Sequence, residues 1–191
     1  MSVYKKDDLD FLLDGLTNFN PDVNIISSGG TARKIKELGY DVTGVSEYTG
    51  FPESPGGLVK TLHPKVHGGI LMDPERKEEG TYLSTQNILS FDALVCNLYP
   101  FQETVESNAG YDEIVEMIDI GGPTLIRSAA KGSLRRGRPV TVVDPGDYES
   151  VIDDLNTYKR VRYSKVKELA KKAFRHTEEY DKKINEWLDS L

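Results

Sequence analysis

Cysteine and histidine are scarce in this sequence, with one cysteine (Cys96) and three histidines among 191 residues. A lone cysteine excludes an intrachain disulfide, and so few thiols and imidazoles argue against a structural zinc site. Long apolar runs are also missing, since no stretch approaches the roughly 20 residues that span a bilayer. Residues 1–8 lack the apolar core of a secretory signal. We therefore expect a cytoplasmic protein that does not enter a membrane.

Positive charge is in the minority, with 24 Lys and Arg residues against 31 Asp and Glu residues and a formal net charge of −7. This balance disfavours binding to nucleic acid, although the local field of a cleft can still favour a small anionic substrate. The one dense basic run, Leu134–Arg138, is interpreted as a solvated loop rather than a nucleic-acid site. We expect no nucleic-acid partner.

Short apolar runs alternate with helical patterns along most of the chain. Strands are predicted over 23–28, 41–45, 92–97 and 139–143, and helices over 31–38, 111–118 and 123–131. This alternation predicts an α/β fold with a mostly parallel sheet. Glycine, proline and polar residues are dense in 46–69, which predicts a long irregular connection with a functional role. From Ser164 onward, apolar residues at helical spacing predict one or two amphipathic helices, packed on the domain or on a second subunit.

A glycine turn lies between the first predicted strand and the helix that follows it. Glycine lets the backbone approach a ligand closely, and a helix N-terminus offers unpaired N–H groups with a partial positive charge. The turn is a candidate phosphate site, and a tight turn without a ligand fits it equally well. Its candidate residues are Ser28, Gly29, Gly30 and Thr31.

Residues 56–69 combine glycines with a lysine, a threonine and two histidines. Lys60 supplies a cation and proton donor, and the hydroxyl of Thr61 is a further donor. His63 and His67 have the i, i+4 spacing of metal ligands on a helix. Because Pro64 and two glycines argue against a helix there, we expect no metal and assign both histidines to structural hydrogen bonds.

The run Asn97–Phe101 follows a buried strand at its carboxyl end. Ligands gather at this edge in open α/β sheets, so Asn97 and Tyr99 are candidates for substrate contact. A tyrosine that merely packs in the core is the alternative for Tyr99.

The run Ile118–Thr124 places an acid before two glycines and a helix start. Asp119 is either a helix cap or a carboxylate held beside an oxyanion-binding helix terminus. Lys131 lies at the other end of the predicted helix, so contact between Asp119 and Lys131 requires the chain to fold back.

Taken in order, these runs resemble the inosine monophosphate (IMP) cyclohydrolase domain, usually the N-terminal half of a bifunctional purine biosynthesis protein that also carries a formyltransferase. The resemblance extends from about Ser2 to Asp181, and no formyltransferase half is present. It rests on Ser-Gly-Gly-Thr-Ala at 28–32, Val-Ser-Glu-Tyr-Thr-Gly-Phe-Pro-Glu at 45–53, Val-Lys-Thr-Leu-His-Pro at 59–64, Asn-Leu-Tyr-Pro-Phe at 97–101, Ile-Asp-Ile-Gly-Gly at 118–122, Ala-Ala-Lys at 129–131 and Lys-Ala-Phe-Arg-His-Thr at 172–177.

The resemblance implies a methylglyoxal synthase-like fold, a Rossmann-like sheet flanked by helices, in a single domain of residues 1–191. A core of about 1–145 would carry a helical extension over about 146–191. Such proteins are expected to work without cofactor or metal, typically as homodimers. The implied reaction closes 5-formamidoimidazole-4-carboxamide ribotide (FAICAR) to IMP, as the carboxamide nitrogen attacks the formyl carbon and water leaves.

By the same resemblance, four residues carry catalysis. Lys60 would be the cation near the formyl oxygen, Tyr99 would orient that oxygen, and Asp119 with Lys131 would handle amide positioning and proton transfer. The remaining candidates would bind substrate or its phosphate: Lys6, Ser28, Gly29, Gly30, Thr31, Thr61, Asn97, Ile120, Gly121 and Gly122. The backbone N–H groups of the last two would assist the reaction.

The sequence departs from the family near the expected phosphate site. Asp7 and Asp8 replace the threonine and glycine common in the family, and Leu58 stands where an arginine is usual. Arginines occur instead at 135, 136 and 138, and we hypothesise that one of them supplies the lost donor.

These departures leave open a non-catalytic effector-binding module of the same fold. A methylglyoxal synthase proper is disfavoured, because it would not need the runs at 97–101 and 118–131. A structural partner for a separate formyltransferase chain is a third reading.

Overall fold

The computed structural model describes residues 1–54, 57 and 59–191 of the chain. Leu58, which stands where the family usually has an arginine, lies outside the described residues. Within the described part, no helix combines the length and apolarity needed to cross a membrane.

Two pairs of short parallel strands form the sheet. Strand β1 (Ile26–Ser27) pairs with β2 (Thr43–Gly44), and β3 (Ala93–Val95) pairs with β4 (Val140–Val142). The first residues of the chain join the two pairs: the Met1 amine donates to the Ile26 carbonyl at 2.6 Å and the Ser2 N–H donates to the Val95 carbonyl at 2.9 Å. The layer therefore reads β2, β1, residues 1–3, β3, β4, which confirms the predicted parallel sheet with shorter strands.

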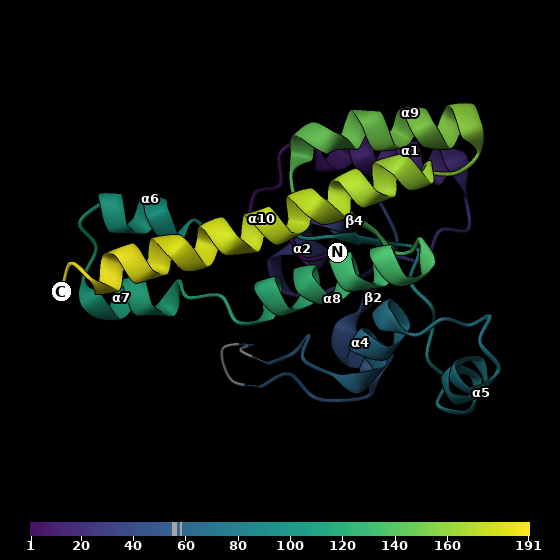
Figure 1. The fold of residues 1–191 in the computed structure, drawn as a ribbon, viewed down its shortest axis with the longest axis horizontal. Coiled ribbons are helices and arrows are strands. Elements are labelled where there is room, and N and C mark those ends of the chain that lie inside the picture. Colours follow the sequence, from purple (N-terminus) through teal and green to yellow (C-terminus); the bar gives the residue numbers. More distant parts are fainter. Residues whose placement is uncertain (55–56, 58) are drawn as a thin grey trace.

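Helices cover both faces of this layer, because alternate strand residues point to opposite sides. On one face, Val95 and Val142 share a core with α1 (Leu9–Phe19), part of α2 (Gly29–Glu37) and α9 (Tyr148–Tyr158). On the other, Leu94 and Cys96 share a core with α4 (Pro64–Leu71), α8 (Gly121–Arg136) and α10 (Tyr163–Leu188). Figure 1 shows α10 running alongside α8, with α1 and α9 together at one side.

The prediction of irregular structure over 46–69 is wrong at both ends of that segment, where α3 (Val45–Thr49) and α4 lie. Pro64 is the first residue of α4, a position where the missing N–H costs nothing. His63 caps α4 by accepting the Lys65 N–H on Nδ1 at 3.1 Å. Buried Gly68 and Gly69 bring α4 close to its neighbours, so glycine here serves helix packing.

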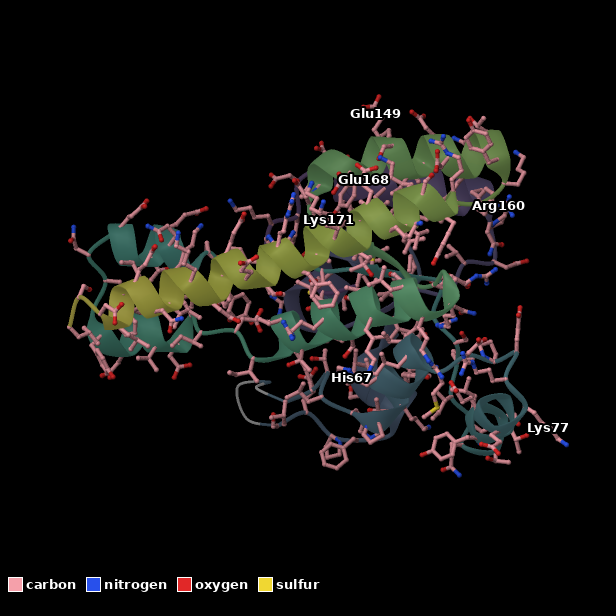
Figure 2. All side chains as sticks on the ribbon, in the orientation of Figure 1. His67, Lys77, Glu149, Arg160, Glu168 and Lys171 are labelled. Atoms are coloured by element: carbon pink, nitrogen blue, oxygen red, sulfur yellow. The ribbon has the colours of Figure 1, made fainter. Side chains whose placement is uncertain are left out.

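The predicted amphipathic tail is confirmed as one helix, the 26-residue α10. Its buried side includes Leu169, Ala173 and Tyr180, whereas charged residues such as Glu168 and Lys171 lie on the outer side (Figure 2). The end of α10 packs on α6 (Phe101–Glu106), and Tyr111 of α7 (Tyr111–Glu116) stacks near its Trp187. The remaining elements are α5 (Lys77–Thr85) and the short 3₁₀ helix η2 (Pro145–Asp147).

We predict that Gly132→Ala destabilises the protein. A Cβ at Gly132 would lie 2.6 Å from the Ile70 carbonyl oxygen of α4 and 3.0 Å from Pro139 Cδ. Overpacking of this kind typically costs about 1–3 kcal/mol, which outweighs the roughly 1 kcal/mol that alanine gains in helix propensity. Thermal unfolding would show a Tm lower by several degrees. Gly110→Ala is the control, because no atom lies within 4 Å of its Cβ position; an unchanged Tm for Gly132→Ala would contradict the prediction.

Candidate functional site

Two lysine amines from other segments of the chain lie near the glycine turn after β1, where α2 begins. Gly29 has φ +56, in the left-handed region that favours glycine. A Cβ there would lie 2.9 Å from Lys60 Nζ, and a Cβ at Gly30 would lie 4.0 Å from Lys6 Nζ. Two ammonium groups from distant segments thus converge on the N-terminus of a nine-residue helix. This combination favours an anion.

The hydroxyl of Thr31 is used inside the fold. The Val3 N–H donates to Thr31 Oγ1 at 3.0 Å, and that hydroxyl donates to the Val3 carbonyl at 2.9 Å. Thr31 is buried and ties α2 to the N-terminal segment. Any contact of Thr31 with a phosphate would therefore come from its backbone N–H.

The side-chain amide of Asn97 has a similar role. Its Oδ1 accepts the N–H groups of Tyr4 at 2.6 Å and Lys5 at 3.0 Å, and its Nδ2 donates to the Lys5 carbonyl at 2.9 Å. Asn97 therefore shapes the turn that leads to Lys6. The Lys6 amine in turn donates to the Tyr4 carbonyl at 2.9 Å.

Asp119 is a helix cap, the first of the two alternatives that the sequence left open. Its Oδ1 accepts the Gly122 N–H at 2.8 Å, so it caps the first turn of α8. Burial raises the pKa of the Asp119 carboxyl, against the opposing effect of the Gly122 and Gly121 N–H groups. Because Asp119 occupies the Gly122 N–H, that group is not free to hold a substrate oxyanion as predicted. Ile120, between these residues, has an exposed side chain.

Thr61 and Tyr99 approach the same helix start. A Cβ at Gly121 would lie 2.9 Å from Thr61 Oγ1, so only glycine admits the threonine. The Tyr99 ring is 43% exposed and meets the Tyr4 ring edge-on at 5.6 Å between centroids. Burial raises the pKa of the Tyr99 phenol, and the nearby negative charge of Asp119 raises it further.

Two sets of contacts start from the glycine turn: one runs through Lys60 and Thr61 to the start of α8 with Asp119, and the other through Lys6 and Tyr4 to Tyr99. The charge of Asp119 acts on the Tyr99 phenol, so the two sets meet around one region of the surface. Lys131 lies outside it, on the exposed side of α8, ten residues beyond Gly121. At 1.5 Å per residue this is about 15 Å along the helix, and the chain does not fold back.

Both histidines of 56–69 form hydrogen bonds, as predicted. His63 caps α4, and His67 Nδ1 lies 2.9 Å from Ser128 Oγ of α8, between the two helices (Figure 2). Burial lowers the pKa of the His67 imidazole, which therefore stays neutral at pH 7. Among the described residues, no group of three or more His, Cys, Asp or Glu side chains is arranged to hold a metal ion.

The hypothesis that an arginine near the end of α8 replaces a phosphate donor is contradicted. Arg135 pairs with Glu79 of α5, and Arg138 pairs with Asp92 at 2.7 Å. Arg136 donates to the carbonyls of Gly69, Ile70 and Phe91. All three guanidinium groups donate to acceptors at the end of α8 that is remote from the glycine turn. Polar groups in such surroundings are normally paired within the protein.

A cavity of about 800 Å³ lies at the end of the sheet where the strands begin, opposite the glycine turn. Its lining includes Val23, Phe91 and Val140, which lie where strands begin. Except for Thr61, the predicted site residues do not line it.

Tyr180 of α10 also reaches the candidate site, and no local motif singles it out. Its hydroxyl accepts the Asp119 N–H at 2.8 Å and donates to the Met117 carbonyl at 2.7 Å. In the sequence it is one more apolar-face residue of an amphipathic helix, and only its place at the end of the family resemblance sets it apart.

Comparison with known proteins places this chain and its fold in a described class. A model of the MGS-like domain matches residues 12–124, and a model of the AICARFT/IMPCHase bienzyme matches residues 137–191. The chain belongs to the MGS-like domain family.

Its relatives include the bifunctional purine biosynthesis protein PurH from Persephonella marina, 50% identical over 86% of this chain and 32% of that protein. PurH from Corynebacterium glutamicum is 47% identical over 98% of this chain and 35% of that protein. The chain thus spans about a third of these curated relatives. The crystal structure of ForH superposes with a TM-score of 0.81 at 28% identity, covering 97% of this chain and 95% of that one.

We predict that Asp119→Asn is as stable as the wild type at pH 7 or more stable. The raised pKa means that folding favours the protonated carboxyl, so the stabilisation is present at low pH and is lost as pH rises through the folded-state pKa. An amide oxygen keeps the cap on Gly122 without the charge. Urea unfolding from acid to neutral pH should show the variant gaining on the wild type. Asp112→Asn, at an exposed position, serves as the control. If Asp119→Asn loses stability relative to the wild type as pH rises, the prediction is refuted.

Proposed function

We propose that this chain is an IMP cyclohydrolase, which closes FAICAR to IMP with loss of water. The observation that carries the proposal is that Lys60 lies against the glycine turn while its neighbour Thr61 lies against the start of α8, which Asp119 caps. PurH relatives that match 86% and 98% of this chain support it. The substrate phosphate would lie at the start of α2, beside the amines of Lys6 and Lys60.

The chemistry needs two groups of one molecule to be held together and protons to be moved. The carboxamide nitrogen forms a bond to the formyl carbon and loses one proton. The formamido nitrogen loses a second proton as it forms a double bond to that carbon, and the formyl oxygen takes up both protons and leaves as water. Lys60 would stabilise negative charge on that oxygen, and Tyr99 would orient it. Asp119 would accept the amide proton, a task suited to a carboxylate whose pKa is raised by burial.

Substrate atoms and side chains supply every proton and electron pair in this scheme. Ring closure with loss of water involves no net oxidation or reduction, so we propose that the protein acts without a cofactor. A separate chain that carries a formyltransferase is the proposed source of the formylated substrate.

We further propose that the enzyme is a homodimer in which Lys131 acts across the interface. Within one chain, Lys131 lies about 15 Å along α8 from the start of that helix. A proton-transfer role beside Asp119 would therefore need the Lys131 of a second copy. Its exposed position on α8 leaves it available for such a contact.

We predict that Lys60→Ala lowers kcat for FAICAR cyclisation by about 100-fold or more, because one preorganised donor to a developing oxyanion contributes that much. Formation of IMP is followed by absorbance. Lys65→Ala is the matched control: this amine on the same segment lies over the Tyr48 ring, 5.9 Å from its centroid. A folded wild-type protein with no more turnover than Lys60→Ala would exclude the enzyme, and binding without turnover would point to an effector module.

Mixing two inactive variants tests the role of Lys131. Asp119→Asn and Lys131→Ala should each lower kcat strongly. If Lys131 acts across the interface, one site of each mixed dimer is intact, and mixing equal amounts should restore about a quarter of wild-type activity. No recovery after subunit exchange, verified with tagged chains, would place both residues in one chain's site or remove Lys131 from catalysis.

A further inference from the structure

The Tyr180 hydroxyl bridges two backbone groups beside the candidate site. It accepts a hydrogen bond from the Asp119 N–H at 2.8 Å and donates one to the Met117 carbonyl at 2.7 Å. A phenol has one proton to donate, and both roles of this hydroxyl are used. Since Tyr180 is only 6% exposed, water competes little for these two bonds.

Aromatic packing fixes where this hydroxyl lies. The Tyr180 ring meets Phe101 of α6 edge-on at 6.1 Å between centroids, and Phe101 meets Trp187 of α10 at 5.8 Å. Edge-to-face pairs of this kind have a preferred geometry and add to the stabilisation from burial. The phenol is therefore held by a buried aromatic cluster, and not by the residues it contacts alone.

The segment that Tyr180 holds connects two helices and carries the candidate base. Met117 directly follows α7, Asp119 lies just before α8, and the three residues 117–119 are outside both helices. The direction of the Asp119 carboxyl depends on the backbone at that position. The same carboxyl accepts the Gly122 N–H at 2.8 Å, so backbone and side chain of Asp119 are each restrained by one hydrogen bond.

We propose that Tyr180 is a positioning residue for the cyclohydrolase reaction: its hydroxyl fixes the 117–119 segment so that the Asp119 carboxylate meets the substrate amide. The proposal rests on the proposed function of the site. It also gives α10 a role beyond packing, because Asp119 lies in the part matched as an MGS-like domain, 12–124, whereas Tyr180 lies in the part matched at 137–191.

Tyr180→Phe tests this, because it keeps the ring and removes only the bridging hydroxyl. A base displaced by a fraction of an ångström to 1 Å costs up to about 100-fold in rate, so we expect kcat to fall by roughly 10- to 100-fold with KM changed less than about threefold. The acidic limb of the pH profile should move to lower pH, because a looser segment lets water reach Asp119 and reduces the burial that raises its pKa. Tyr111→Phe is the matched control, since it removes an exposed hydroxyl near Trp187 in the same cluster.

A second measurement separates this proposal from the proposed function. The Asp119 carboxyl is titrated by carbon-13 NMR in the wild type and in Tyr180→Phe, which requires no turnover. A lowered Asp119 pKa in the variant supports positioning even if FAICAR is not the substrate, and an unchanged pKa overturns it. If the wild type is active, an unchanged kcat and pH profile in Tyr180→Phe also overturns it.

Should Tyr180→Phe fail to fold, Phe101→Leu replaces it. This change leaves the hydroxyl in place and loosens the ring that carries it, so kcat should fall less, with the acidic limb shifted in the same direction. A Phe101→Leu protein of lowered stability with unchanged kcat and pH profile would show that the cluster is structural only, and would overturn the proposal.

Discussion

Residues 1–3 lie between β1 and β3, and both the continuity of the sheet and the position of Lys6 depend on this placement. The Ser2 N–H pairs with Val95, and the Thr31 hydroxyl holds both the N–H and the carbonyl of Val3. Without this segment the two strand pairs share no backbone hydrogen bonds among those described. The same segment leads into the Tyr4–Lys5 turn held by Asn97, which brings Lys6 to the start of α2. The N-terminal segment therefore both joins the two strand pairs and positions the Lys6 amine beside the glycine turn.

The site balances two kinds of charge in separate places. Lysine amines gather at the N-terminus of α2, where the helix dipole also favours an anion. The acid lies at the N-terminus of α8, where it accepts the Gly122 N–H, and burial nevertheless keeps its pKa above the ordinary value. A substrate with a phosphate at one end and an amide to deprotonate at the other matches this separation. The separation of charge is therefore compatible with the reaction that we propose, and PurH relatives match 86% and 98% of this chain.

Most candidate residues were chosen for chemistry that is local in the sequence. Within a few residues, the sequence shows a glycine turn before a helix, an acid before Gly-Gly and a lysine among glycines, and each pattern predicts a role. Local chemistry does not predict side-chain partners that are distant in sequence. The Thr31 and Asn97 side chains bind backbone near the N-terminus, and the arginines after Leu134 pair with α4, α5 and Asp92. Proline and glycine within 56–69 argue against the α4 helix, yet Pro64 starts that helix and the glycines allow it to pack.

The sequence by itself determined the α/β class, the parallel sheet, the amphipathic tail and the identity of the residues around the glycine turn, because periodicity and turn chemistry are local properties. Only the tertiary structure decided which of those residues meet. It brought Lys60 against Gly29, Thr61 against Gly121 and Tyr180 against Asp119, and it left Lys131 about 15 Å along α8 from the start of that helix. The physical reason is that each contact joins segments far apart along the chain, and their approach is set by how helices pack on the sheet.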